Sequence, residues 1–169
     1  MKLTLSIATI FTFALGFYTT QTIAAPLENP KSFTDWCEQK STLPPQTKHT
    51  VEVLLETAQT QNCKEANQKL TNLTYLNLNS NKISNIKPLS AMTNLTSLSL
   101  ESNEISDIKL LSNLTNLTIL SLDLNQISDI KPLSALTKLE ILNINKNPIA
   151  HKICPVKPES ICQFDWPQN

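Results

Sequence analysis

The chain has 169 residues, no formal net charge at pH 7, fourteen lysines, no arginine and one glycine. Because arginine supplies the bidentate contacts that phosphates and guanine edges accept, a neutral chain without it is not expected to bind nucleic acid. The one glycine, Gly16, lies near the N-terminus. The rest of the chain therefore cannot contain a glycine-rich phosphate loop or a glycine-framed nucleophile elbow.

The first residues have the composition of a secretory signal peptide. Lys2 supplies a positive charge, an uncharged apolar stretch runs from Leu3 to Tyr18, and small residues follow at Ala24. The apolar stretch is shorter than the roughly 20 residues that a membrane span needs. We therefore predict a signal peptide over 1–24, a secreted or periplasmic location, and no membrane insertion after signal cleavage.

Residues 25–70 are expected to form a linker and a helical N-terminal cap. Apolar residues recur at helical spacing between Pro45 and Ala58 and make one face. Asn62 and Glu65 have the spacing of a capping box, which predicts a second short helix ending near Leu70. Two aromatic residues further upstream are expected to pack beside these helices: Phe33 and Trp36.

Four segments, each starting 22 residues after the previous one, repeat a single pattern. They read LTYLNLNSN from Leu73, LTSLSLESN from Leu95, LTILSLDLN from Leu117 and LEILNINKN from Leu139. The parts between them also match: KISNIKPLSAM, EISDIKLLSNL and QISDIKPLSAL. The pattern LxxLxLxxN is that of leucine-rich repeats, and over residues 71–150 the chain resembles the 22-residue class found in internalins.

The repeat pattern predicts an α/β fold, a leucine-rich repeat solenoid. Leucines that alternate along a short strand enter the core, and stacked units form a parallel sheet on the concave face, with 3-10 or irregular structure on the convex side. We expect units at 71–92, 93–114, 115–136 and 137–150. The asparagine that ends each pattern is assigned to the turn, where its amide can satisfy backbone groups. These residues are Asn81, Asn103, Asn125 and Asn147.

Residues 151–169 are predicted to form a C-terminal cap. Pro148 breaks the repeat, and too few residues follow for another unit. Apolar side chains of this region are expected to lie over the last layer of the core, and they are Ile149, Ile153, Ile161, Phe164 and Trp166.

Four cysteines allow three disulfide pairings. Two caps separated by four repeats would lie roughly 15–20 Å apart, which is beyond the reach of a disulfide. We therefore predict the pairs Cys37–Cys63 and Cys154–Cys162. The cysteine-bearing flanks resemble those of small exported bacterial leucine-rich repeat proteins, and this resemblance implies an activity of repeat-mediated interaction.

The concave strand face is the usual binding surface of leucine-rich repeats, so the resemblance implies partner-binding residues at its outward positions. They are Tyr75, Asn77, Asn79, Ser97, Ser99, Glu101, Ile119, Ser121, Asp123, Ile141, Asn143 and Asn145. Several apolar side chains in one patch, with Leu124 just beyond, would indicate a contact site. Glu101 and Asp123 give that patch a negative centre, which predicts a partner with a basic feature. Sequence drift on a scaffold face is the alternative.

Catalysis is not expected. His49 and His151 fall in opposite caps, so a Ser-His-Asp group cannot assemble. Glu101 and Asp123 would lie on a flat, wet surface, which does not suit paired acid–base catalysis, and they offer too few oxygens for calcium. The sequence contains no CxxC pair. We therefore predict no metal site and no cofactor.

Two functions remain. The first is a secreted protein-binding module that uses its concave sheet face. The alternative is a module that binds a glycan or cell-envelope polymer, for which Tyr75 is the single concave aromatic. The concave face covers about 350 Å², against about 800 Å² per partner in a standard interface. We therefore expect weak or multivalent binding of another protein by a monomer.

Overall fold

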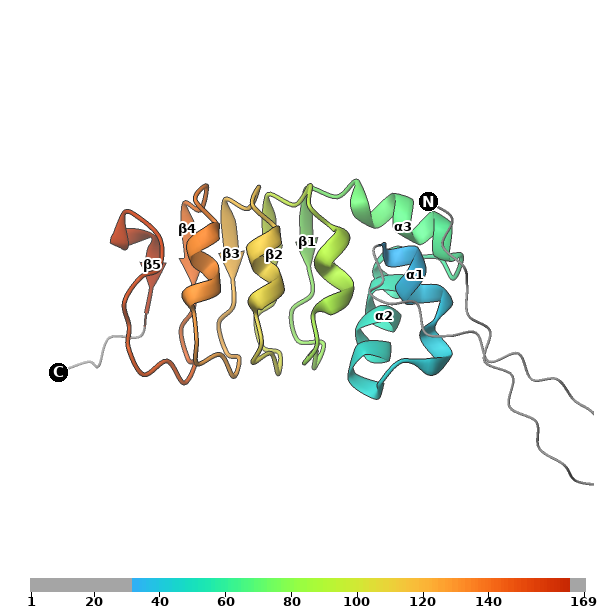
Figure 1. The fold of residues 1–169 in the computed structure, drawn as a ribbon, viewed down its shortest axis with the longest axis horizontal. Helices are drawn as coiled ribbons and strands as arrows, with labels where there is room; N and C mark the ends of the chain where they lie inside the picture. The colour runs from blue at the N-terminus through green and yellow to red at the C-terminus, as the bar shows by residue number, and fades with distance from the viewer. Residues whose placement is uncertain (1–31, 165–169) are drawn as a thin grey trace, which may run out of the picture.

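The computed structural model describes residues 32–164. The predicted signal peptide over 1–24 and Trp166 lie outside this range. Within it the chain forms a solenoid, with a helical cap at the N-terminal end and a parallel sheet through the repeats (Figure 1). This is the α/β fold class that the repeat pattern predicts. None of the helices between residues 32 and 164 is long and apolar enough to cross a bilayer.

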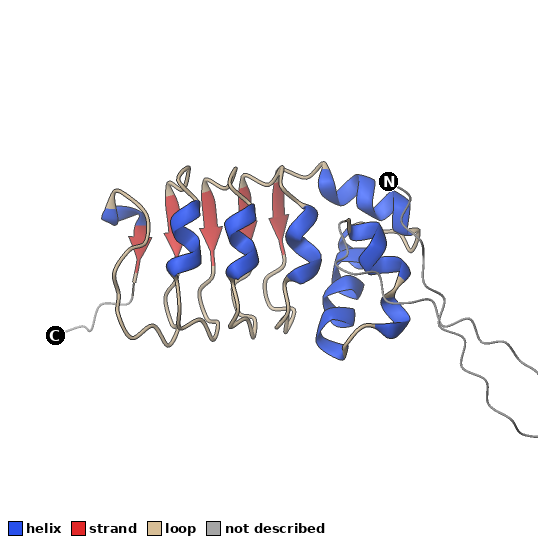
Figure 2. Ribbon diagram, in the orientation of Figure 1, coloured by secondary structure: helices blue, strands red, loops and turns tan. Residues whose placement is uncertain are grey.

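The strands form a parallel sheet of order β1-β2-β3-β4-β5. They are β1 (Tyr75–Asn77), β2 (Ser97–Ser99), β3 (Ile119–Ser121), β4 (Ile141–Asn143) and β5 (Cys162–Gln163). The register advances by one sequence repeat per strand, so that Leu76 pairs with Leu98 and Leu98 with Leu120. The strand arrows consequently all point the same way in Figure 2.

Short 3-10 helices close the core on the side opposite the sheet (Figure 2). They are η2 (Lys87–Ala91), η3 (Lys109–Asn113) and η4 (Lys131–Ala135). The Oδ1 atom of Asn85, Asp107 or Asp129 accepts the backbone N–H two residues later and starts each turn. Each turn buries one leucine of its centre, and these are Leu89, Leu111 and Leu133.

Asparagine side chains join each repeat to the next. The amide nitrogen of Asn103 donates to the carbonyl of Leu78 in the preceding repeat and to that of Leu100 in its own, both at 2.9 Å. Its Oδ1 accepts the N–H of Ile83 at 2.9 Å. Asn125 and Asn147 repeat this arrangement one and two units later. Asn81 starts the series, and within residues 32–164 its amide donates only to the carbonyl of Asn79.

Replacing Asn125 by Ala should destabilise the solenoid strongly. The change leaves the buried N–H of Ile105 without its acceptor and removes donors from three carbonyls, so we expect about 3 kcal/mol to be lost from the free energy of unfolding. Asn81→Ala is the matched control and should cost about 1 kcal/mol. Denaturant unfolding of both variants measures the difference, and equal losses would contradict the role given to this amide.

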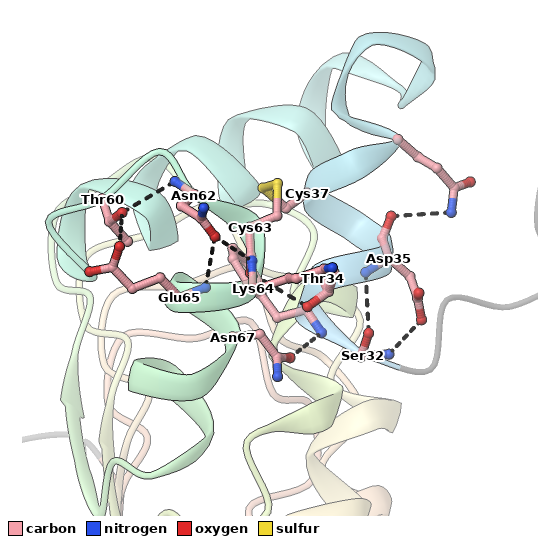
Figure 3. Close-up of a disulfide and its surroundings, with 12 residues drawn as sticks. Ser32, Thr34, Asp35, Cys37, Thr60, Asn62, Cys63, Lys64, Glu65 and Asn67 are labelled. Carbon is pink, nitrogen blue, oxygen red and sulfur yellow. Dashed lines mark hydrogen bonds between the residues drawn. A yellow bond between two sulfur atoms is a disulfide. The ribbon is translucent and has the colours of Figure 1, made fainter.

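The N-terminal cap consists of α1 (Phe33–Glu38), η1 (Lys40–Thr42), α2 (Pro45–Thr57) and α3 (Cys63–Thr71). The two helices that the apolar spacing and the Asn62 signal predict are present as α2 and α3. Helix α1 is additional. Ser32 accepts the N–H of Asp35 and Asp35 accepts that of Ser32, which forms a reciprocal capping box (Figure 3).

The start of α3 differs from the predicted capping box. Asn62 Oδ1 accepts the N–H groups of Lys64 and Glu65, as expected for an N-cap. The Glu65 carboxylate, however, accepts the Thr60 hydroxyl, and the Thr60 oxygen accepts the N–H of Asn62 (Figure 3). Bonds from Lys69 and Thr60 lower the pKa of Glu65. The reciprocal half of the box is thus relayed through a threonine hydroxyl.

The two disulfides lie at opposite ends of the solenoid. Cys37 of α1 is bonded to Cys63 at the start of α3, and Cys154 is bonded to Cys162 of β5. This is the pairing that two separate caps predict. The first bond ties together two helices that are far too short to be stable alone, since isolated helices under about 12 residues are marginal in water.

Polar side chains of α2 dock the cap on the first repeat. The buried Thr50 hydroxyl donates to the carbonyl of Asn85 at 2.7 Å, and the Asn85 amide donates to Thr47 Oγ1 at 3.0 Å. His49 Nε2 donates to the carbonyl of Asn81 at 2.6 Å. The later repeats carry Asp107 and Asp129 at the position of Asn85, and a carboxylate there has no N–H to donate.

Replacing Thr50 by Val should weaken this junction. Valine keeps the shape but leaves the Asn85 carbonyl without its donor in a buried site, so we expect a loss of about 1–3 kcal/mol of unfolding free energy. Thr57→Val on the same helix is the control, because Thr57 is exposed and bonds only a helix carbonyl. Thermal denaturation compares the two, and a larger effect at Thr57 would contradict the docking role.

The C-terminal cap corrects two expectations. Ile149 and Ile161 are buried and Phe164 packs against the core, but Ile153 is 73% exposed. The Ile153 N–H bonds the carbonyl of His151 in a tight turn that directs this side chain outward, and Val156 is buried in its place. Residues that are too few for a repeat also supply β5, which extends the sheet beside β4.

Candidate interaction surface

The outward side chains of β1 to β4 and of the turns after them form the sheet face, which consists of three rows that cross the strands. The first row is Tyr75, Ser97, Ile119 and Ile141. The second row is Asn77, Ser99, Ser121 and Asn143. The third row, just past the strand ends, is Asn79, Glu101, Asp123 and Asn145. Every predicted concave-face residue lies in one of these rows.

The first row is apolar and accessible. Tyr75 is 58% exposed, and Ile119 and Ile141 are each 39% exposed. The pairing register places Ile119 and Ile141 on neighbouring strands, whereas Ser97 separates Ile119 from Tyr75. A small serine between two large side chains leaves a gap in the row. The row therefore offers two isoleucines side by side, a gap, and a tyrosine.

The second row is polar and partly occupied by the protein itself. Asn77 Oδ1 accepts the N–H of Asn79, and the Ser99 hydroxyl donates to Asn79 Oδ1. Asn143 Oδ1 is buried, and no partner for it is present between residues 32 and 164. This row separates the apolar row from the acidic one.

The third row holds two acidic side chains, Glu101 and Asp123, and its side chains also accept backbone N–H groups. Asn79 Oδ1 accepts the N–H of Glu101 at 2.8 Å, and Asp123 Oδ1 accepts the N–H of Asn145 at 2.6 Å. Asp123 thus stabilises the stacking of two repeats, a role that the sequence pattern did not reveal. Glu101 is half-buried next to it. The row keeps a negative charge although one carboxylate oxygen is committed.

Leu124 does not join the apolar row. It is 41% exposed, but it lies five positions after Ile119, beyond the third row. Its φ of 56° is in the left-handed region, as are those of the equivalent Ser80, Ser102 and Lys146. A leucine there costs about 1–2 kcal/mol of backbone strain. Leu124 follows the end of β3 and lies in the turn, so the apolar row itself consists of Tyr75, Ile119 and Ile141.

The structure also contains a hollow that the sequence did not indicate. It measures about 730 Å³ and lies between Trp36 of the cap and the turns η2 and η3. We call this side of the solenoid, opposite the sheet and formed by η2, η3 and η4, the helical-turn side. Leu110 lines it, at the position that Pro88 and Pro132 occupy in the neighbouring repeats. Asn113 lines it too, where the neighbours carry alanine. The repeat at 93–114 thus differs from its neighbours at two positions that line the hollow, and this difference in the sequence is the signal that could have predicted it.

Groups typical of catalysis are not gathered on the sheet face. His49 bonds the backbone at the cap junction, and His151 is exposed in the C-terminal loop. Over residues 32–164, histidine, cysteine and acidic side chains form no cluster of three or more that could hold a metal ion. What the face offers chemically is apolar contact on one margin and negative charge on the other.

Comparison with known proteins agrees with this architecture. The family model described as leucine-rich repeats in two copies matches residues 71–114, 93–132 and 115–157, which together span 87 of the 169 residues (157 − 71 + 1). The chain belongs to the leucine-rich repeat family. None of the curated proteins matches the chain.

Solved internalins share the fold of this leucine-rich repeat protein. An internalin of Listeria monocytogenes, inlF, is 31% identical, with 66% of this chain and 35% of that one covered, at a TM-score of 0.55. The functional domain of InlJ from Listeria monocytogenes is 25% identical over 80% of this chain and 28% of that one, at 0.57. The present chain thus spans about a third of the length of these relatives.

Replacing Leu124 by Gly should stabilise the protein. Glycine adopts a positive φ without the clash that strains leucine, so we expect a gain of about 1 kcal/mol in unfolding free energy. Gln126→Gly, at an exposed position outside the positive-φ residues, is the control and should lower it. Chemical denaturation of both variants checks the opposite signs, and a loss at Leu124 would show that its side chain packs.

Proposed function

We propose that this leucine-rich repeat protein is exported and binds another protein through its sheet face. The observation that carries the proposal is the exposed apolar row of Tyr75, Ile119 and Ile141. Large apolar side chains on a solvated sheet face lower the solubility of a monomer unless a partner covers them, and central aromatic and aliphatic groups supply most interface energy. Binding rather than catalysis fits the chemistry of the face.

Export is supported by the cysteines and by the N-terminal composition. All four cysteines of the chain are paired in disulfides, which persist in oxidising compartments and are rare in the cytosol. The uncharged apolar stretch from Leu3 to Tyr18 has the length of a signal peptide. Both observations favour the periplasm or the medium as the location of the mature protein.

A protein partner fits the face better than a glycan or an envelope polymer does. Sugar rings stack on aromatic side chains, and Tyr75 is the one aromatic residue in the three rows. Aliphatic groups such as Ile119 and Ile141 instead match the apolar core of a protein interface. Since the face offers only about 350 Å², one site gives weak binding, and several copies of the partner site would raise the avidity.

The double variant Tyr75→Ser, Ile119→Ser tests the proposal. Immobilised wild-type protein should retain a protein from the producing cell's envelope fraction, and the double variant should retain at least about tenfold less, because two anchors are lost. Leu110→Ser, on the helical-turn side, is the matched control and should bind like the wild type. A parallel screen against envelope polysaccharides distinguishes the alternative.

Equal capture by the wild type and the double variant would contradict the proposed face. If the wild type retained polysaccharide and no protein, and the double variant no longer retained the polysaccharide, the glycan alternative would be favoured. Circular dichroism of each variant excludes unfolding as the cause, since both substituted side chains are exposed at the surface.

A further inference from the structure

The length of the first row fits a short α-helix laid across the strands. Neighbouring strands are about 4.8 Å apart, so Ile119 lies roughly 10 Å and Ile141 roughly 14 Å from Tyr75 along the row. A helix rises about 1.5 Å per residue, so about ten residues, or three turns, span the row. Residues on one side of such a helix recur every 4.5–6 Å, about one per strand of the sheet.

The width of the sheet face also fits a helix. Each third-row position comes four positions after its first-row position, just past the strand end, which corresponds to at most about 13 Å of extended chain. A helix with its side chains is about 10–12 Å across, so it can reach the apolar row and the acidic row at once. An extended peptide would place same-side residues about 6.7 Å apart and would match neither the spacing nor the width.

The charge of the sheet face selects among helices. Over the four strands and the turns after them, the charged outward residues give a net charge of −2 from three acids and one base. Glu101 and Asp123 lie in the third row, Lys146 follows that row, and Glu140 precedes the first row. The apolar row and the acidic row lie at opposite margins. A complementary helix is therefore apolar along one side and basic along the adjacent side.

We propose that the partner of the sheet face is a basic amphipathic α-helix of about three turns that lies perpendicular to the strands. Its apolar side rests on Ile119, Ile141 and Tyr75, and a large side chain enters the gap above Ser97. Lysine or arginine on its flank faces Glu101 and Asp123. This inference rests on the proposed function, because it assigns the chemistry of the partner to the same face.

Three synthetic peptides test the shape and the charge of the partner. The first is a leucine–lysine peptide of about four turns with its leucines on one helical side. The second carries two central prolines that prevent the helix, and the third has glutamate in place of lysine. We expect the first peptide to shift the amide resonances of the three rows in ¹⁵N-labelled full-length protein, and the other two to bind at least about tenfold more weakly.

Variants of the protein test which row contacts the apolar side of the peptide and which contacts its basic side. Ile119→Ser should weaken the first peptide about tenfold, and Glu101→Gln should weaken it and reduce its dependence on salt. Ser97→Tyr fills the gap and should also weaken it, whereas Leu110→Ser on the other side should not. Each variant removes or adds a side chain at an exposed or half-buried position, so the fold is retained.

The outcomes separate this inference from the proposed function. Equal binding of the helical and the proline-containing peptides at the three rows would overturn the helix but leave the face as the binding site. Resonance shifts confined to the helical-turn side, or no binding of the first peptide, would overturn the inference. Loss of envelope-protein capture in the Tyr75 and Ile119 double variant tests the proposed function independently of any peptide.

Discussion

The stability of this solenoid depends on the hydrogen bonds that one asparagine amide makes in each turn. One repeat does not satisfy all of its own backbone where the chain leaves the strand: Asn103 donates to the carbonyl of Leu100 in its own repeat, but the buried N–H of Ile105 has its acceptor in the next one. Asn125 bonds both groups and thereby joins two repeats. Burial of the leucine column, the parallel register and the alignment of the outward rows all require that these bonds form, since an unpaired buried amide costs about 1–3 kcal/mol.

At the two ends of the solenoid the series of asparagines stops, so the backbone groups of the first and last repeats find other hydrogen-bond partners. At the N-terminal end, α2 supplies hydroxyl and imidazole groups to the first repeat, and Asn85 replaces the aspartate of the later units so that it can donate to Thr47. At the C-terminal end, two residues of β5 pair with β4 and are held by the disulfide to Cys154. At each end, hydrogen bonds pair the backbone groups of the terminal repeat, and a disulfide holds the capping segment in place.

The stacking of the repeats also determines how side chains are arranged on the sheet face. Because the register is fixed, residues that vary from repeat to repeat are brought into rows, and the rows differ in character: apolar, polar and acidic. The commitment of Asp123 to a backbone N–H shows that such variation also serves the scaffold. Ile119 and Ile141 make no comparable bond among residues 32–164 and remain partly exposed, which is why the proposed partner is placed on them.

The sequence by itself determined the repeat, the class of the fold, the helices α2 and α3, the disulfide pairing and the composition of each row, because all of these follow from local spacing or from a fixed period. Only the tertiary structure decided that α1 forms, that Ile153 is exposed, that Leu124 adopts a positive φ, and that Asp123 supports the backbone. Those features depend on contacts between segments and on the direction of each turn. A linear pattern does not contain that information, because it records which residues recur but not which atoms meet.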